Sequence, residues 1–212
     1  MTKVRPLRRD AQRNRDLLVA AARRAFASRG LDVPLEDIAK EAGVSIGTLY
    51  NRFPTRGTLV DAALADKVAG MVEQAETAAT MADPWEAFAW FLARCCETQA
   101  ADRGYNELCV RVLPDTPEID LLKARGHELV RTVVDRAQRS GQLRADFHDG
   151  DFAFVLWSTT TIIEATASTA PDAWRRHLGF MLDGFRASAA HPLPSPPLEP
   201  DEVGKAMRTY GG

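Results

Sequence analysis

The sequence predicts an all-α protein with a small N-terminal domain and a larger helical C-terminal domain. Along most of the chain, apolar residues recur every three or four positions, as they do on one face of a helix. The chain lacks the strict alternation of apolar and polar residues that marks strands, and it is rich in Ala, Leu, Arg and Glu. Hydrophobic residues make up 45 % of the 212 positions, which is enough to bury a sizeable core.

Charge is distributed unevenly along the chain. Residues 1–60 carry 12 Lys and Arg against 6 Asp and Glu, a net charge of +6. Residues 61–212 carry 15 against 23, a net charge of −8. The overall charge of −2 therefore does not by itself exclude a nucleic-acid partner for the basic segment. A chance asymmetry of solvated charges is the alternative.

The first helix is expected over residues 10–29, and Gly30 suits its C-terminal end. The preceding residues 1–9 are basic and are predicted to form a flexible arm. The apolar stripe of the helix consists of Leu17, Leu18, Ala21, Ala22, Ala25 and Phe26.

Two short helices follow. Pro34 can open a helix over residues 35–42, with acidic residues in the first turn where the helix dipole favours them. Gly43 can end this helix, and Ser45 can cap a third helix over residues 46–52. The apolar side of the third helix is formed by Ile46, Leu49, Tyr50 and Phe53, and its polar side by Gly47, Thr48, Asn51 and Arg52.

Helix, short turn and helix together form the helix-turn-helix pattern, here over residues 34–53. The second helix of this pattern enters the major groove of DNA, which is about 12 Å wide and admits one helix. Gly47 would let the start of that helix approach a phosphate closely. The sequence therefore predicts a DNA-binding domain over residues 10–56. A fourth helix, over residues 56–80 and capped by Thr55, leads out of it.

The segment PLEDIAKEAGVSIGTLYNRFPTRGTLVDAAL resembles the DNA-binding segment of TetR-type transcriptional regulators. The segment GQLRADFHDGDF, residues 141–152, is similar to one common in the C-terminal domains of that family. The resemblance implies that residues 46–52 are the recognition helix. It also implies that Thr48 and Tyr50 meet phosphates or base edges and that Arg56 binds a phosphate.

The candidate DNA-binding residues are Ser45, Gly47, Thr48, Tyr50, Asn51, Arg52 and Arg56. Several have other interpretations. Tyr50 falls on the apolar side and could be a core residue, and Thr48 could serve only as a capping partner of Ser45. Asn51 and Arg52 could be solvated surface, and Arg56 an ordinary cation in the first turn of its helix.

A regulatory and dimerisation domain is expected over residues 57–190. Beyond the fourth helix, it should contain helices over residues 84–101, 104–113, 117–140, 150–169 and 172–189. The segment 191–212 holds 5 of the 12 prolines and is predicted to be a disordered or extended tail.

The last two of these helices indicate a homodimer. Helix 150–169 is apolar around nearly its whole circumference, so it must be covered on all sides, and the family resemblance implies the same two-helix interface. A monomeric core is the alternative. The candidate interface residues are Phe154, Ile162, Trp174, Leu178, Met181, Leu182 and Phe185.

The resemblance also implies a ligand pocket in the C-terminal domain. Pockets are mostly apolar with few polar groups, which fits the aromatic-rich helices, although aromatic residues at helical spacing can equally form plain core. The candidate ligand-binding residues are Trp85, Phe88, Phe91, Leu92, Cys95, Leu108, Trp157, Thr161 and Glu164.

No catalytic residue, metal ligand or cofactor is predicted. His148, Asp149 and Asp151 lie at an expected helix start, where Asp is a normal cap, and they lack zinc-type spacing. Three cysteines without framework spacing argue against a disulfide-stapled secreted domain. The N-terminus has no apolar signal region, and no uncharged run of 18 apolar residues is found. A cytoplasmic protein without a membrane partner is expected.

These inferences predict a DNA-binding transcriptional regulator. It is expected to be a repressor that acts as a homodimer on a palindromic operator and responds to a small hydrophobic effector. One alternative is an activator or architectural DNA binder without an effector. Another is a helical interaction module whose basic domain binds acidic proteins.

Overall fold

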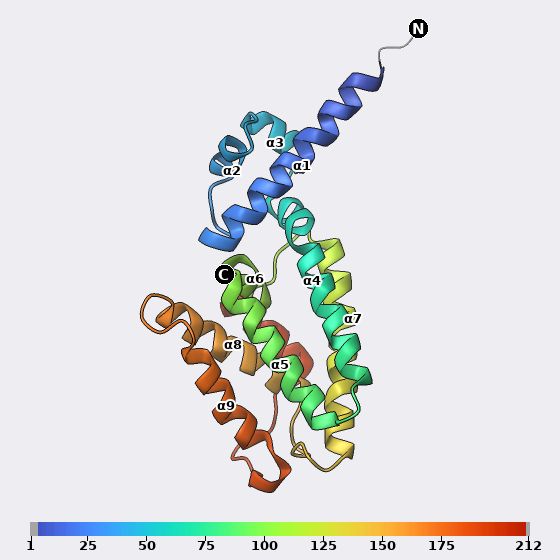
Figure 1. Ribbon diagram of the computed structural model, residues 1–212, viewed down its shortest axis with the longest axis vertical. Coiled ribbons are helices and arrows are strands. Elements are labelled where there is room, and N and C mark those ends of the chain that lie inside the picture. Colours follow the sequence, from blue (N-terminus) through green and yellow to red (C-terminus); the bar gives the residue numbers. More distant parts are fainter. Residues whose placement is uncertain (1–3, 211–212) are drawn as a thin grey trace.

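The computed structural model describes residues 4–210, and this part of the chain is helical without a strand. The all-α prediction is confirmed. Figure 1 shows an elongated molecule in which a head lies above a larger body. The helices are α1 (Val4–Arg29), α2 (Leu35–Glu41), α3 (Ile46–Arg52), α4 (Arg56–Thr80), α5 (Pro84–Ala101), α6 (Arg103–Val110), α7 (Pro117–Arg139), α8 (Asp149–Thr166), α9 (Ala173–Phe185), the 3-10 turn η1 (Ala187–Ala189) and α10 (Pro200–Tyr210).

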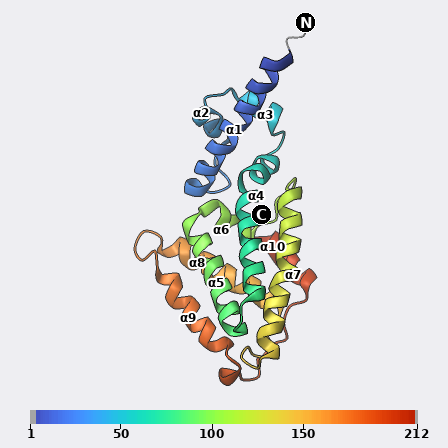
Figure 2. The ribbon, with the colours of Figure 1, turned by 45° about the vertical axis from the view of Figure 1, so that its right-hand side comes forward.

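The head consists of α1, α2 and α3, and α4 runs from the head down into the body (Figure 1). In the body, α4 packs along α7, and α5 contacts α4, α7 and α8. The last helix pair, α8 and α9, packs on the other side of α5, and both views show this arrangement (Figure 2). One continuous apolar core therefore runs from α1 in the head to α9 in the body.

Local signals in the sequence explain the helix ends. Gly30 and Gly43 have φ angles of +86° and +70°, the left-handed conformation in which glycine readily ends a helix. The side chain of Thr55 accepts a bond from the N–H of Thr58 and caps α4, whereas Asp83 accepts bonds from two backbone N–H groups and caps α5. These caps fix where α4 and α5 begin.

At both ends of the chain the structure differs from the expected flexible segments. Helix α1 begins at Val4 rather than at residue 10. Pro6 is tolerated there because it lies in the first turn, where a missing N–H costs little. Residues 1–3 of the expected arm lie outside the described residues. Near the other end, Pro200 starts α10, which packs against α8, while the residues between η1 and α10 are exposed and not helical.

Within the described residues, no helix has both the length and the apolar character needed to cross a lipid bilayer.

Candidate nucleic-acid interface and body cavities

Helix α3 is held to the head by its apolar side. Leu49 is fully buried, Phe53 is nearly so, and Ile46 packs against the same core. The guanidinium of Arg15 lies 5.6 Å from the centre of the Phe53 ring. A helix of seven residues is too short to be stable alone in water, so this burial is what keeps α3 folded.

The start of α3 is closed by Ser45. Its hydroxyl oxygen accepts a hydrogen bond from the backbone N–H of Thr48 at 3.2 Å, and the two hydroxyl oxygens lie 2.9 Å apart. Thr48 is thus a capping partner of Ser45, as the alternative interpretation held. Its side chain is nevertheless only partly buried, so the same hydroxyl is open to a second contact.

The opposite side of α3 is exposed. Gly47, Asn51 and Arg52 are open to solvent, and the side chain of Tyr50 is 46 % exposed. The alternative that Tyr50 is a core residue is therefore wrong. Six of the seven predicted DNA-binding residues lie together on this exposed α3 face, which consists of Ser45, Gly47, Thr48, Tyr50, Asn51 and Arg52.

The seventh residue, Arg56, has contacts that its sequence position did not indicate. Its Nη1 donates hydrogen bonds to the backbone oxygens of Leu31 at 2.6 Å and Val33 at 2.7 Å. These bonds tie the first turn of α4 to the segment between α1 and α2. Arg56 therefore braces the head internally, and its contact with a phosphate stays a prediction.

Further positive charge lies on α1. Arg9 and Arg13 are exposed, and both views show the first turns of α1 extending beyond α3 at the end of the molecule away from the body (Figures 1 and 2). The exposed α3 face and this basic extension thus share one end of the molecule.

Comparison with known proteins identifies this arrangement. The sequence profile of bacterial regulatory proteins of the tetR family matches residues 18–63, and that of the SbtR-like transcriptional regulator C-terminal domain matches residues 83–187. A TetR transcription regulatory protein from Mycobacterium vanbaalenii is 32 % identical over 85 % of this chain and 99 % of its own, with a TM-score of 0.51. The chain belongs to the TetR family.

Other TetR-family structures are similar as well. SCO0520 from Streptomyces coelicolor is 29 % identical, covers 81 % of this chain and 98 % of its own, and has a TM-score of 0.50. FadR from Bacillus subtilis, solved with stearoyl-CoA, shares the fold at 18 % identity, with 83 % and 99 % coverage and a TM-score of 0.63. No curated protein matches the chain. The predicted helix-turn-helix of this TetR-family protein is confirmed, as α2 and α3.

In the body of this TetR-family protein, most of the predicted ligand-binding residues form core. Aromatic rings on α5 pack against rings of other elements, as Phe88 does edge-on against Phe147 and Phe91 does face-on against Phe152. The buried candidates line none of the cavities described below. They are Trp85, Phe88, Phe91, Leu92, Cys95 and Leu108.

The three candidates on α8 lie elsewhere. Trp157 is partly buried. Thr161 is exposed, and its hydroxyl donates to the backbone oxygen of Trp157 at 3.2 Å, a local bond that helical threonines commonly make. Glu164 alone among the nine candidates lines a described cavity.

Two of the predicted dimer-interface residues on α9 are buried within the protomer. Trp174 and Leu178 are only 2 % and 4 % exposed and pack into the protomer's own core. Four other predicted interface residues are partly buried and pack against the same core, namely Ile162, Met181, Leu182 and Phe185. Phe154 of α8, also a predicted interface residue, is 36 % exposed, and Phe180 of α9, which was not predicted, is 61 % exposed.

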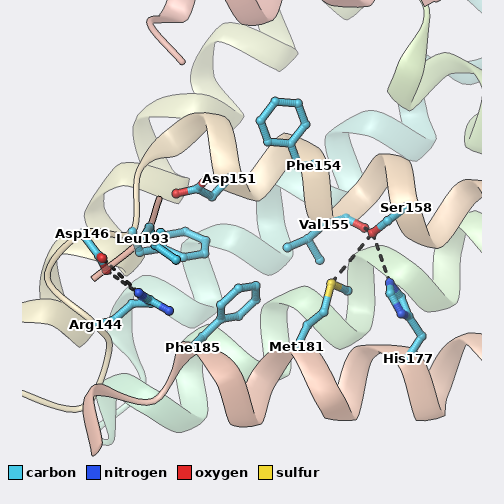
Figure 3. A pocket seen from close by; sticks show the side chains of 11 residues that line it. Arg144, Asp146, Asp151, Phe154, Val155, Ser158, His177, Met181, Phe185 and Leu193 are labelled. Carbon is cyan, nitrogen blue, oxygen red and sulfur yellow. Dashed lines mark hydrogen bonds and ion pairs between the residues drawn. The ribbon is translucent and has the colours of Figure 1, made fainter. Parts of the chain in front are cut away.

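One cavity, the α8–α9 cavity, has a volume of about 380 Å³ (Figure 3). Its walls include Phe154 and Ser158 of α8, His177 and Met181 of α9, and Leu193 from the segment before α10. The hydroxyl oxygen of Ser158 lies 3.2 Å from Nε2 of His177, within hydrogen-bond distance. Arg144 and Asp146 also line this cavity, and the hydrogen bond from Arg144 lowers the pKa of Asp146.

A second cavity, the seam cavity, lies where the head meets the body and has a volume of about 440 Å³. It is lined by Ala27 and Ser28 at the end of α1, Gln99 of α5, Arg103 and Asn106 of α6, and Glu164 of α8. Sequence reasoning missed Gln99 and Asn106, because a lone amide on a helix gives no signal of the partners that surround it.

The predicted helix start near His148 is also found. His148 is the N-cap residue of α8, and its backbone N–H donates to the side chain of Asp151 in the first turn at 2.8 Å, as in a capping box. Among the described residues, no group of three or more His, Cys, Asp or Glu side chains has the arrangement of a metal site.

Proposed function

We propose that the protein is a transcriptional repressor that binds a palindromic operator as a homodimer and is released by a small effector. The exposed α3 face carries this proposal. It presents amide, guanidinium and hydroxyl groups on a helix whose other side is locked into the head by Leu49 and Phe53. A rigid polar helix of this kind suits the major groove.

Each residue of the exposed α3 face suits a particular contact. Asn51 and Arg52 can form paired hydrogen bonds with base edges, as Asn does with adenine and Arg with guanine. The hydroxyls of Thr48 and Tyr50 suit phosphates, and Gly47 leaves room for the sugar–phosphate backbone near the helix start. Base contacts would then select the operator sequence, while phosphate contacts would set the register on DNA.

A homodimer is proposed through α8 and α9, centred on the exposed rings of Phe154 and Phe180. Large apolar side chains exposed on the surface of a helix pair can mark an interface. A two-fold axis between two copies would place the two α3 helices on half-sites one helical turn apart, about 34 Å.

The dimer is tested by Phe180→Glu, with Leu178→Glu as the matched variant on the same helix. Charge at the exposed position 180 should yield folded monomers in light scattering, whereas charge at buried position 178 should unfold the body. If Phe180→Glu remains a dimer, the interface lies on another surface.

Regulation by an effector is proposed from the α8–α9 cavity and the seam cavity. Their volumes, about 380 and 440 Å³, fall within the range usual for small-molecule sites. Two proteins of the same fold were solved with small molecules, RolR with resorcinol and FadR with stearoyl-CoA. An effector that binds better to a form unable to fit DNA would favour release of the operator, to the extent set by its difference in affinity for the two forms.

The decisive experiment is a gel-shift titration with DNA from upstream of the protein's own gene, at several salt concentrations. The proposal expects a specific complex that outlasts competitor DNA and weakens steeply with salt. Absence of any complex at low salt would favour the alternative of a helical interaction module. Such a repressor would act in the cytoplasm, where its operator lies.

A second experiment separates the repressor from an activator or architectural binder without an effector. Thermal denaturation is followed across a set of small hydrophobic compounds. Selective stabilisation by a few compounds, together with loss of the gel shift, supports the ligand-responsive repressor. Uniformly unchanged denaturation curves would favour a protein without an effector.

A further inference from the structure

The chain beyond α9 folds back over the α8–α9 cavity. This C-terminal strap consists of residues 191–199 and α10, and it lies outside both matched family profiles, which end at residues 63 and 187. Leu193 of the strap forms part of the cavity wall, toward the end where Arg144 lies (Figure 3). A segment beyond the matched C-terminal domain thus completes the wall of this cavity.

The root of the strap is fixed to the body. The backbone N–H of Arg144 donates to the oxygen of Phe185 at 3.0 Å, and that of Ala187 donates to the oxygen of Gln142 at 2.9 Å. Nη2 of Arg144 then donates to the backbone oxygen of His191 at 2.9 Å. The strap therefore starts from a set position beside the cavity.

Beyond this root the strap is held loosely. Four of residues 192–197 are prolines, which have no N–H to donate and make the segment stiff. Leu193 is 54 % exposed although it lines the cavity. The same segment, together with Asp146 and Asp151, lines a further cavity of about 430 Å³, so it does not pack closely on the body. Opening a segment with so few contacts costs little free energy.

The far end of the strap rests on the start of α8. Helix α10 packs against α8, and a Cβ at Gly150 would lie 3.1 Å from a methyl carbon of Val203 and 3.4 Å from the backbone oxygen of Leu198. Glycine at position 150 therefore leaves room for this close approach. The contact between Gly150 and Val203 is apolar, so it can break without exposing an unpaired charge.

The α8–α9 cavity under the strap suits an apolar guest. Polar groups of its wall are engaged with one another, Arg144 with Asp146 and Ser158 with His177. The other walls are mostly aromatic and aliphatic, namely Phe147, Phe154, Val155, Met181, Phe185 and Leu193. Binding to such walls is driven by the removal of hydrocarbon from water.

We propose that the C-terminal strap is a lid, which opens to admit an uncharged apolar molecule to the α8–α9 cavity and closes over it with Leu193. The strap swings about its fixed root while α10 leaves α8. Closure over a guest buries hydrocarbon on both, so the guest itself favours the closed lid. This inference rests on the proposed function only in taking the guest to be the effector.

The test is stopped-flow fluorescence of the whole protein with N-phenyl-1-naphthylamine, an uncharged dye that brightens in apolar surroundings. In the variant Gly150→Cys with Val203→Cys, a disulfide should hold α10 on α8, because the approach at Gly150 suits Cβ atoms about 3.5–4.5 Å apart. The oxidised variant should admit and release the dye about tenfold more slowly than the same sample after reduction, since the lid cannot open. Parent protein treated with the same oxidant is the control and should not change.

Two further variants locate the dye and its cover. Leu193→Ala should release the dye about fivefold faster, because apolar contact between the leucine and the dye is lost. Leu121→Ala is the matched control, since Leu121 is an exposed leucine on α7, and it should behave like the parent protein. Ser158→Phe fills the cavity and should lose most of the dye binding.

The inference is overturned if the parent protein binds no dye, if the disulfide does not form, or if its reduction leaves the dye kinetics unchanged. Release from Leu193→Ala at the parent rate, or full dye binding by Ser158→Phe, overturns it as well. The gel shift without ligand reports separately on the proposed function. A protein that binds DNA but whose dye kinetics ignore the strap keeps that function and loses this inference. A protein with a working lid that never binds DNA does the reverse.

Discussion

Glu107 of the body accepts a hydrogen bond of 2.8 Å from the backbone N–H of Leu31 in the head. Next to this bond, Arg111 makes a two-pronged contact with Asp32, at 2.9 and 3.2 Å. Helix α6 therefore holds the turn that leads into the helix-turn-helix. Because Asn106 of the same helix lines the seam cavity, α6 contacts the cavity on one side and the head on the other.

Glu107→Ala should lower the free energy of unfolding by about 1–3 kcal/mol, because the N–H of the fully buried Leu31 would lose its acceptor. Urea denaturation measures this change. Glu128→Ala is the control, since the Glu128 carboxylate makes an exposed pair with Arg125 at 3.3 Å and its loss should shift stability by under about 1 kcal/mol. Equal effects of the two substitutions would mean that the Leu31 contact contributes little.

Two glycines in α4 should respond in opposite ways to alanine. A Cβ at Gly57 would lie 1.9 Å from the backbone oxygen of Pro114, so Gly57→Ala must displace the segment after α6 and lower the melting temperature. A Cβ at Gly70 meets nothing within 4 Å, so Gly70→Ala should raise stability by about 0.5–1 kcal/mol through helix propensity. Thermal denaturation of the two variants decides the matter, and an unaffected Gly57→Ala would contradict the close approach.

Asp32→Asn should produce a pH-dependent loss of stability. The hydrogen bond from Arg111 lowers the pKa of Asp32 in the folded protein. A lowered folded pKa contributes stability above the unfolded pKa, and this stability is lost as the pH falls through the folded pKa. The difference between parent and variant should thus be present near pH 7, at under about 1 kcal/mol because Asp32 is exposed, and vanish in acid. A difference that is constant with pH would exclude the Asp32 charge as its cause.

The cysteines should react slowly with iodoacetamide in the native protein. Burial raises the pKa of Cys95, raises that of Cys96 to about 12 and that of Cys109 to about 11. Since the thiolate is the reactive form, little of it is present near pH 8. Mass spectrometry should find the three thiols unlabelled in buffer and fully labelled in urea. Cys109 is only partly buried, so rapid labelling of Cys95 or Cys96 in the native protein is the result that would contradict this account.

Local signals in the sequence predicted the head well. Ser45, Thr55 and the glycines at helix ends act within a few residues, so the bounds of α3 and α4 followed from spacing alone. The exposed α3 face followed from the same periodicity, except for Tyr50 at its edge. The prediction for Arg56 was incomplete, because its hydrogen-bond partners Leu31 and Val33 lie 25 and 23 residues away in the chain.

The body was harder to predict, for a physical reason. An apolar stripe shows that a helix face is buried but not what buries it, so the α9 stripe with Trp174 and Leu178 was assigned to a partner copy when it faces the protomer's own core. In the same way, periodicity cannot distinguish a pocket wall from close packing, as in α5. Helix α10 was missed because the prolines before it dominate the composition of that segment.

The measurement that tests the central claim most directly is operator binding by Arg52→Ala, followed by fluorescence anisotropy. Arg139→Ala is the matched control, because both arginines are exposed in the last turn of a helix, but Arg139 lies on α7 in the body. The exposed α3 face predicts that Arg52→Ala loses about 1–3 kcal/mol of operator affinity with unchanged helix content. Arg139→Ala should bind like the parent protein. Parent-like operator binding by both Arg52→Ala and Asn51→Ala would contradict the account.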